Sequence, residues 1–243
     1  MIYKQILNCL NKRKLLSVLI DPDEYDNRSL IKTIELANHA RIDFFFVGGS
    51  LVSTFHKFEY SIKLIKENSD IPVIIFPGSI LQVSGKADGI LLLSLISGRN
   101  PDYLIGNHVQ SAFAIKNTNL EVLPTGYILI ENGHTTSVEY ISNTKPIPAG
   151  KHDIATATAI AGELMGNKLI YLEAGSGAAN TVGCGLIQKI KQNISIPLIV
   201  GGGIKTKEQL NKIYNAGADI VVIGNAIEQQ PDLIGELVLW ERE

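Results

Sequence analysis

The 243-residue sequence contains few of the residues that mark several common protein classes. It has only two cysteines, Cys9 and Cys184, which lie far apart without a partner at metal-ligand spacing, so it predicts neither a disulfide framework nor a zinc site. Free thiols suit a reducing cytoplasm. Lysine plus arginine number 22 and aspartate plus glutamate 24, so no basic excess exists to bind nucleic acid by counterion release. We therefore expect a cytoplasmic protein with no nucleic-acid partner.

Long apolar runs are also missing. The longest, from Ile90 to Leu93 and on past Ser94 to Ile96, is far shorter than the ~20 residues that a membrane-spanning helix needs. The amino-terminal residues mix polar side chains such as Lys4 among apolar ones and show no cleavable signal pattern. We expect a soluble protein without a transmembrane segment, whose substrate can still be a lipid and which can contact a membrane peripherally.

The composition that is present suits a packed core, with 45% apolar, 19% charged and 7% aromatic residues. Eight short runs are almost continuously apolar, which is typical of strands covered on both faces. They span Leu15–Ile20, Ile42–Val47, Pro72–Phe76, Gly89–Leu93, Gly126–Ile130, Lys168–Leu172, Ile196–Val200 and Asp219–Ile223.

Stretches with helical periodicity separate most of these runs, and Asn27 or Ser29 is expected to cap the first of them. They span Ser29–Ala40, Ser61–Glu67, Asp102–Ile115, Ile154–Met165, Thr181–Gln192, Thr206–Asn215 and Asp232–Trp240. Parallel strands need crossovers of about a dozen residues or more, and right-handed βα units fit these spacings. Because such barrels usually have about 250 residues, the chain is predicted to be a (β/α)8 TIM barrel, one domain over residues 1–243.

One crossover is expected to be irregular. Only Pro77–Asp88 separates the third and fourth apolar runs, and this segment contains Pro77, Gly78 and Gly85. These residues disfavour a full helix, so the barrel wall is expected to be thin after the third strand. Longer loops are predicted at 94–101 and 131–153, the second of which is rich in turn formers.

In such a barrel the functional residues lie at the carboxyl ends of the strands. Three successive strand ends are rich in glycine, namely Gly175-Ser176-Gly177, Gly201-Gly202-Gly203 and Gly224-Asn225. Their backbone N–H groups can point at one spot with no Cβ in the way, and barrels frequently hold a phosphate after strands seven and eight. These loops predict a phosphorylated ligand, and the alternative is that the glycines only make tight turns.

Carboxylates at other strand ends suggest a second site. Asp21 and Asp23 follow the first strand and Ser50 follows the second. Magnesium (Mg²⁺) prefers one or two carboxylates, a hydroxyl and substrate phosphate oxygens, so this set suits metal-assisted binding of a diphosphate. The alternative is that Asp21 or Asp23 caps the following turn.

Glu173 follows the sixth strand beside the predicted phosphate loop. Because side chains two apart on a strand share a face, Tyr171 and Glu173 can both point at one ligand. Glu173 could then take a proton from a hydroxyl of that ligand, or serve as a structural acceptor. The five histidines have no ligand or triad spacing, and no Gly-Lys-Ser or Gly-Lys-Thr follows a glycine loop, which disfavours nucleotide hydrolysis.

The strand-end motifs together form a more specific pattern than any one of them. They are Leu19-Ile20-Asp21-Pro22-Asp23, Val47-Gly48-Gly49-Ser50, Leu95-Ile96-Ser97-Gly98-Arg99-Asn100-Pro101, Tyr171-Leu172-Glu173-Ala174-Gly175-Ser176-Gly177, Val200-Gly201-Gly202-Gly203-Ile204 and Ile223-Gly224-Asn225-Ala226. This set resembles the geranylgeranylglyceryl phosphate synthases, a family that includes the bacterial PcrB-like enzymes. The resemblance runs in register from about Leu15 to Ile227.

The resemblance implies a prenyltransferase that joins sn-glycerol 1-phosphate to a polyprenyl diphosphate, taken here as geranylgeranyl diphosphate. It would form an ether bond and release diphosphate with Mg²⁺, and Asp21 and Ser50 match the family's magnesium site. Glu173 matches the residue proposed to deprotonate the acceptor. The residues that match its glycerol-phosphate site are Tyr171, Leu172, Glu173, Ala174, Gly175, Ser176, Gly177, Gly202, Gly203, Gly224 and Asn225.

The same resemblance implies a homo-oligomer, and one departure from it is Glu24, where many members have a lysine. A prenyl tail needs an apolar groove, for which Ile80, Leu81 and Leu104 near the thin wall are candidates. The alternative enzyme class is a sugar-phosphate isomerase or aldolase-like barrel. Its chemistry needs a lysine Schiff base or an acid-base pair, and no strand end offers an obvious lysine. The non-enzymatic alternative is a regulatory barrel that binds a phosphorylated metabolite, which would not explain Asp21, Ser50 and Glu173.

Overall fold

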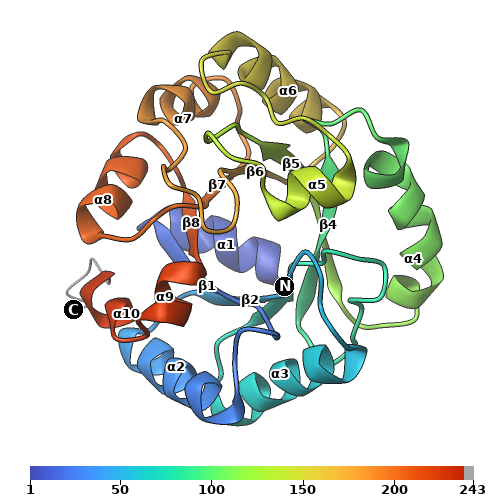
Figure 1. Ribbon diagram of the computed structural model, residues 1–243, viewed down its shortest axis with the longest axis vertical. Helices are drawn as coiled ribbons and strands as arrows, with labels where there is room; N and C mark the ends of the chain where they lie inside the picture. Colours follow the sequence, from blue (N-terminus) through green and yellow to red (C-terminus); the bar gives the residue numbers. More distant parts are fainter. Residues whose placement is uncertain (238–243) are drawn as a thin grey trace.

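Each apolar run predicted from the sequence forms a strand, and the strands close into a parallel barrel, β1 to β8 in chain order (Figure 1). This computed structural model describes residues 1–237. The strands are β1 Leu15–Ile20, β2 Phe44–Val47, β3 Val73–Ile75, β4 Gly89–Leu95, β5 Glu121–Leu129, β6 Leu169–Glu173, β7 Leu198–Gly201 and β8 Ile220–Ile223. The predicted (β/α)8 architecture is confirmed.

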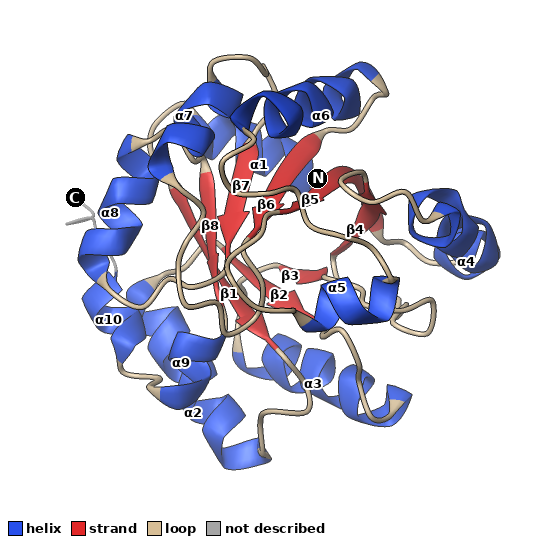
Figure 2. Cartoon of the chain, turned by 45° about the horizontal axis from the view of Figure 1, so that its top comes forward, coloured by secondary structure: helices blue, strands red, loops and turns tan. Residues whose placement is uncertain are grey.

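Helices cover the outside of the barrel and connect most of its strands (Figure 2). They are α1 Ile2–Leu10, α2 Asn27–Ala40, α3 Phe55–Asn68, the π-helix η1 Asp102–Gly106, α4 Asn107–Lys116, α5 Ser137–Ser142, α6 His152–Leu164, α7 Cys184–Lys191, α8 Lys207–Asn215, α9 Asn225–Gln229 and α10 Leu233–Leu237. The helix predicted over Asp232–Trp240 is present as α10, while its positions 238–240 lie outside the described residues. Within residues 1–237 no helix has the length and apolar character needed to cross a membrane.

Alternating side chains along the strands divide the core into two layers. Outward-facing residues such as Val18 and Ile170 pack against the helices, and inward-facing residues such as Phe44 and Tyr171 fill the barrel. The inner layer is therefore a packed core over most of its height, and only its carboxyl end is available for chemistry.

Helix α1 fills the amino-terminal end of the barrel, crossing behind its centre in Figure 1. Ile2 and Ile6 of this helix are buried in the inner layer. The backbone N–H groups of Ile2 and Tyr3 donate hydrogen bonds to the carboxylate of Glu121 on β5, which places a negative charge at the helix amino terminus.

The third βα unit is irregular, as the sequence predicts. The segment Pro77–Asp88 contains no helix, so no helix of the outer ring follows β3. β3 pairs with β4 at Gly89 and Ile90, whereas β5 pairs along β4 as far as Leu95. The upper half of β4 therefore has a strand on one side and none on the other, and the barrel wall is thin at this point.

The predicted cap of α2 and the predicted extent of the loop at 131–153 are wrong. Helix α2 is capped by Asp26, because Asp26 has the extended backbone of an N-cap and its side chain accepts the N–H of Ser29 at 2.7 Å. Asn27 is already helical, and Ser29 is the reciprocal member of the capping box rather than the cap. The predicted loop 131–153 contains the short helix α5, whose amino terminus is capped by Thr136.

Candidate active site

A polar cavity lies at the carboxyl ends of the strands, with about 1350 Å³ of space between its atoms, part of it open to solvent. Ten of the predicted site residues line this polar cavity: Asp21, Ser50, Tyr171, Glu173, Ser176, Gly177, Gly202, Gly203, Gly224 and Asn225. They come from β1, β2, β6, β7 and β8 or the loops that follow. The barrel closure thus brings together residues that are up to about 200 positions apart in sequence.

Three other predicted residues do not line the cavity. Leu172 and Ala174 are buried in the outer layer, because residues that alternate with Tyr171 and Glu173 face the helices. Gly175 contributes through its backbone, since its N–H donates to Oε1 of Glu173 at 2.6 Å.

Glu173 lies at the end of β6, buried, with a carboxylate that faces the polar cavity. Burial raises the pKa of Glu173 to about 7, while the hydrogen bond from Gly175 and the nearby hydroxyl of Tyr171 oppose this rise. No lysine or arginine pairs with it among the described residues. A buried carboxylate that can gain and lose a proton near neutral pH is suited to general base chemistry.

Tyr171 lies beneath Glu173 on the same face of β6. Its hydroxyl is buried beside the Glu173 carboxylate, with no hydrogen bond of good geometry within residues 1–237, so it can reach a ligand held at Glu173. Its ring centroid lies 5.4 Å from that of Phe76 and 5.2 Å from that of Tyr127. These three rings form the floor of the polar cavity.

The glycine loops after β6, β7 and β8 meet on one side of the cavity. Asn225, the first residue of α9, accepts two hydrogen bonds at Oδ1, from the hydroxyl of Ser176 at 2.8 Å and from the N–H of Gly177 at 3.0 Å. Gly202 has a φ of +89°, and a Cβ there would lie 2.5 Å from Oε1 of Glu173. Glycine at this position therefore lets the amide-rich loop and the carboxylate approach each other.

On the opposite side of the cavity, Asp21 and Ser50 lie at adjacent strand ends, and the backbone of Gly49 runs directly past the Asp21 carboxylate. Burial raises the pKa of Asp21, and the carboxylates of Asp23 and Glu24 raise it further, although the N–H of Asp23 donates to Asp21 Oδ1 and opposes the rise. The pKa of Glu228 is raised to about 7 by burial and by Asp21 and Glu24. This side of the cavity is thus rich in carboxylates.

These residues fit the predicted magnesium site. The carboxylate of Glu24 raises the pKa of Asp21 and of Glu228, and Asp21 raises that of Glu228 as well, so a divalent cation would relieve this repulsion. Within residues 1–237 no three His, Cys, Asp or Glu side chains gather as a metal cage. One carboxylate and one hydroxyl, with phosphate oxygens of a substrate completing the shell, is the arrangement that Mg²⁺ prefers over such a cage.

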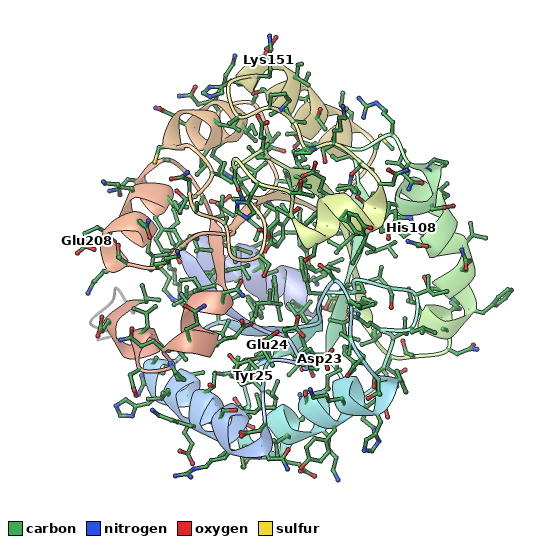
Figure 3. All side chains as sticks on the ribbon, viewed as in Figure 1. Asp23, Glu24, Tyr25, His108, Lys151 and Glu208 are labelled. Atoms are coloured by element: carbon green, nitrogen blue, oxygen red, sulfur yellow. The ribbon has the colours of Figure 1, made fainter. Side chains whose placement is uncertain are left out.

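Asp23 joins the two loops that carry Asp21 and Ser50. Its carboxylate accepts the N–H and the hydroxyl of Ser53, each at 2.6 Å, and lies 3.1 Å from Nζ of Lys57. Figure 3 labels Asp23 and Glu24 together at the rim that follows β1. Asp23 therefore holds the two loops in place and does not line the cavity. The turn cap that the sequence offered as an alternative is made by Asp21, whose Oδ1 accepts the N–H of Asp23 at 3.0 Å.

A second cavity, the apolar groove, opens where the wall is thin, with about 870 Å³ of space between its atoms, part of it open to solvent. It is lined mainly by Ile80, Val83, Ile90, Leu91, Leu92, Leu93, Leu95, Tyr103, Asn107, His108, Ser111 and Ile115. The two cavities meet at the aromatic floor, and the residues that line both are Gly49, Ser50, Phe76, Tyr127, Val138 and Ile141.

The groove exists because the upper half of β4 lacks a neighbour on the β3 side. The carbonyl of Leu93 on this free edge is hydrogen-bonded at 2.8 Å to Nε2 of His108 from α4, labelled in Figure 3. Of the groove candidates named from the sequence, Ile80 lines the groove, whereas Leu81 and Leu104 do not. Leu81 is exposed at the rim and Leu104 packs in the outer layer.

Sequence reasoning missed Glu228 and Lys205 as cavity residues. Glu228 lies three positions after Asn225, so the two share a face of α9, but a five-residue helix leaves too little periodicity to detect. Lys205 is the one lysine or arginine that lines the polar cavity in the described part of the chain, and its place after the glycine loop is the signal that could have identified it.

Comparison with known proteins agrees with this geometry. The family model of the PcrB family matches residues 8–239. The geranylgeranylglyceryl phosphate synthase of Flavobacterium johnsoniae is 51% identical over 228 residues, which cover 93% of each protein. That of Spirosoma linguale is 46% identical over 234 residues, 96% of this chain and 94% of the relative.

Solved structures are also similar over nearly their whole length. The crystal structure of (S)-3-O-geranylgeranylglyceryl phosphate synthase from Thermoplasma acidophilum, in complex with its substrate sn-glycerol-1-phosphate, matches with a TM-score of 0.92 and 32% identity. The match covers 97% of this chain and 96% of that one, so the two share the fold over almost all of both chains.

Proposed function

The chain belongs to the PcrB family, and from this premise we propose that it is a prenyltransferase that joins sn-glycerol 1-phosphate to a polyprenyl diphosphate. The relatives named geranylgeranylglyceryl phosphate synthase support this activity, as does the structural neighbour that binds sn-glycerol-1-phosphate. The reaction forms an ether bond and releases diphosphate.

The observation that carries the proposal is the junction of two unlike cavities. The polar cavity offers glycine-loop amides and carboxylates, which suit two phosphorylated groups, and the apolar groove suits a hydrocarbon tail. They meet at Phe76 and Tyr127, next to Tyr171 and Glu173. An isomerase, an aldolase or a regulator of phosphorylated metabolites would have no use for the groove.

Glu173 is proposed as the general base. The glycerol phosphate would be anchored by the loops at Gly177, Gly202 and Gly224, with its free hydroxyl between Glu173 and the groove. The hydroxyl oxygen forms a bond to the first carbon of the prenyl chain, the bond from that carbon to the diphosphate breaks, and the hydroxyl proton passes to the Glu173 carboxylate. The buried hydroxyl of Tyr171 would form a hydrogen bond with the same hydroxyl of glycerol phosphate.

Asp21 and Ser50 are proposed to hold Mg²⁺ together with the diphosphate. When bound, the cation would neutralise charge on the diphosphate, because an allylic diphosphate leaves readily only when its charge is neutralised. Asp21 supplies the carboxylate and Ser50 the hydroxyl, and Asp23 keeps their two loops together.

The donor is proposed to be geranylgeranyl diphosphate, because the relatives' name specifies that chain and the groove extends along β4 away from the chemistry. We also propose a homo-oligomer in the cytoplasm. It would contact membrane lipid peripherally when it takes up or releases prenyl substrates, because a long hydrocarbon tail partitions into a bilayer.

The test is incubation with radiolabelled sn-glycerol 1-phosphate and a series of prenyl diphosphates, with and without Mg²⁺. We expect lipid-soluble label that depends on a long donor and is lost in excess EDTA. A protein that only binds phosphorylated metabolites would yield no lipid-soluble label, and an isomerase would ignore the prenyl donors.

A further inference from the structure

Glu228 is a half-buried carboxylate of the polar cavity to which neither the base role nor the magnesium site assigns a task. Its Oε2 accepts a hydrogen bond from Nδ2 of Asn225 at 3.1 Å. The other end of the same amide, Oδ1 of Asn225, accepts from the hydroxyl of Ser176 and the N–H of Gly177. One side chain thus links α9 to the loop after β6.

The amide of an asparagine has a donor end and an acceptor end, and its orientation follows its neighbours. At the loop after β6 the N–H of Gly177 can only donate, so that side requires Oδ1, and the hydroxyl of Ser176 donates to the same oxygen. At the other side the carboxylate of Glu228 only accepts hydrogen bonds, so that side requires Nδ2. Within residues 1–237 Glu228 is the partner of the donor end, so without it only the hydrogen bonds at Oδ1 hold the amide in this orientation.

We propose that Glu228 is a positioning residue for the acceptor phosphate, acting by holding the Asn225 amide so that the Ser176-Gly177 turn keeps its place beside Gly224 and Gly202. This rests on the proposed function, in which the phosphate of sn-glycerol 1-phosphate binds at these loops. Glu228 contacts Asn225 and not the phosphate, so its effect reaches the ligand through Asn225.

A simple charge effect predicts the opposite sign. A carboxylate that faces a cavity for anions repels them, so its removal alone should tighten the binding of glycerol phosphate. Loss of an orienting hydrogen bond should instead weaken binding. The direction of change on replacing Glu228 therefore separates the two explanations.

The experiment is calorimetric titration of the full chain with sn-glycerol 1-phosphate, without prenyl donor or divalent cation. Glu228→Ala removes both the charge and the acceptor, and should weaken binding about three- to tenfold, the worth of one hydrogen bond. Glu228→Gln removes the charge but keeps an oxygen for Nδ2 of Asn225, and should bind at least as tightly as the wild type. Glu24→Gln, which removes a neighbouring charge without touching Asn225, should do the same.

A second arm tests the route through Asn225. In an Asn225→Ala background, Glu228→Ala should add no further loss, because the group that it orients is gone. Thermal unfolding of each variant identifies any that fails to fold. If Glu228→Ala fails to fold, the isosteric Glu228→Gln variant is still compared with the wild type.

The possible results distinguish a failure of this inference from a failure of the proposed function. Unchanged or tighter binding by Glu228→Ala overturns this inference and leaves the proposed function standing, as does an equal loss in the Asn225→Ala background. Weaker binding by Glu228→Gln to the same extent as Glu228→Ala also overturns it. A wild-type protein that does not bind sn-glycerol 1-phosphate overturns the proposed function and the inference with it.

Discussion

The two sides of the barrel mouth are both built from βα units, but they present different chemical groups. On the β6–β8 side every strand has two neighbours and a helix follows each loop, so the glycine loops are held in fixed positions. On the β2–β4 side β3 is short, no helix follows it, and β4 leaves its upper backbone edge to His108. The first side presents backbone amides and the second presents aliphatic side chains.

The difference teaches how one rim can hold two unlike ligands. An amide cradle needs a complete wall behind it, because its donors must stay in place without a ligand. A groove for a flexible hydrocarbon needs a gap in the wall and apolar sides, which the missing third helix supplies. Glu173 lies where the two sides meet, so changes there and on either side should have separable effects.

The largest effect is expected at this meeting point. Glu173→Gln keeps the volume of the side chain but removes the proton acceptor, so turnover should fall by about 10²–10⁴-fold, the usual contribution of a general base. Binding of sn-glycerol 1-phosphate should persist, because the glycine loops are untouched. The matched control is Glu35→Gln on the exposed face of α2. A near-wild-type rate for Glu173→Gln would refute the base role.

The pH dependence tests the same residue without a mutation. Burial raises the pKa of Glu173 to about 7, and only the ionised carboxylate can accept a proton. The rate should therefore be flat well above this pKa and fall about tenfold per pH unit well below it, or about fiftyfold from pH 7 to pH 5. In Glu173→Gln this limb should disappear. A profile that stays flat down to pH 5 would contradict the assignment.

On the groove side, a bulky residue in the wall should act on the donor alone. Ser111 on α4 is buried and lines the groove, so Ser111→Phe should reduce turnover of a long prenyl donor more than tenfold, since displacing even two CH₂ groups costs roughly 1.6 kcal/mol. A short prenyl donor should be affected less, and glycerol phosphate binding not at all. Phe113→Ala, on the exposed face of the same helix, is the control. Equal losses with short and long donors would show that the groove does not hold the chain.

Much of this comparison was predictable from the sequence, because it depends on local patterns. Buried parallel strands are continuous apolar runs, and the glycines and prolines after β3 mark the absent helix. Strand β5 was predicted to begin at Gly126 but begins at Glu121. The prediction was too short because Pro124 and Gly126 interrupt the apolar pattern of the strand. Pro124 is tolerated because its carbonyl still accepts the N–H of Lys168, so the strand keeps its connection to β6.

The site was predictable only as a set of strand ends. The alternation rule placed Tyr171 and Glu173 in the cavity, but the same rule excludes Leu172 and Ala174, which the family motif includes. Glu228 could not be found in this way, because its role depends on the turn of a short helix and on an amide that is shared with another loop. Such contacts follow from tertiary packing and leave no periodic signal.

On the amide side, two glycines with positive φ should differ. Gly202→Ala places a Cβ 2.5 Å from Oε1 of Glu173 and 2.9 Å from the N of Gly175, so it should disturb their hydrogen bond and weaken glycerol phosphate binding about tenfold. In Gly177→Ala the new Cβ has no atom within 4 Å, so the substitution adds only backbone strain and should cause a smaller loss of glycerol phosphate binding. Titration with sn-glycerol 1-phosphate measures both. A ranking in the reverse order would show that the close approach of Gly202 to Glu173 does not matter.

The smallest effect is expected at the loops that carry Asp21 and Ser50, because a side chain and not a complete wall holds them together. Asp23→Ala removes the acceptor of the Ser53 N–H and hydroxyl, so the Mg²⁺ concentration for half-maximal rate should rise about three- to tenfold. The rate at saturating Mg²⁺ and the binding of glycerol phosphate should change little. Ser53→Ala deletes one of the two hydrogen bonds and should give an intermediate shift. If the half-maximal concentration stays the same in both variants, the polar groups around Asp21 and Ser50 hold their loops without Asp23, and the two sides of the mouth are equally rigid.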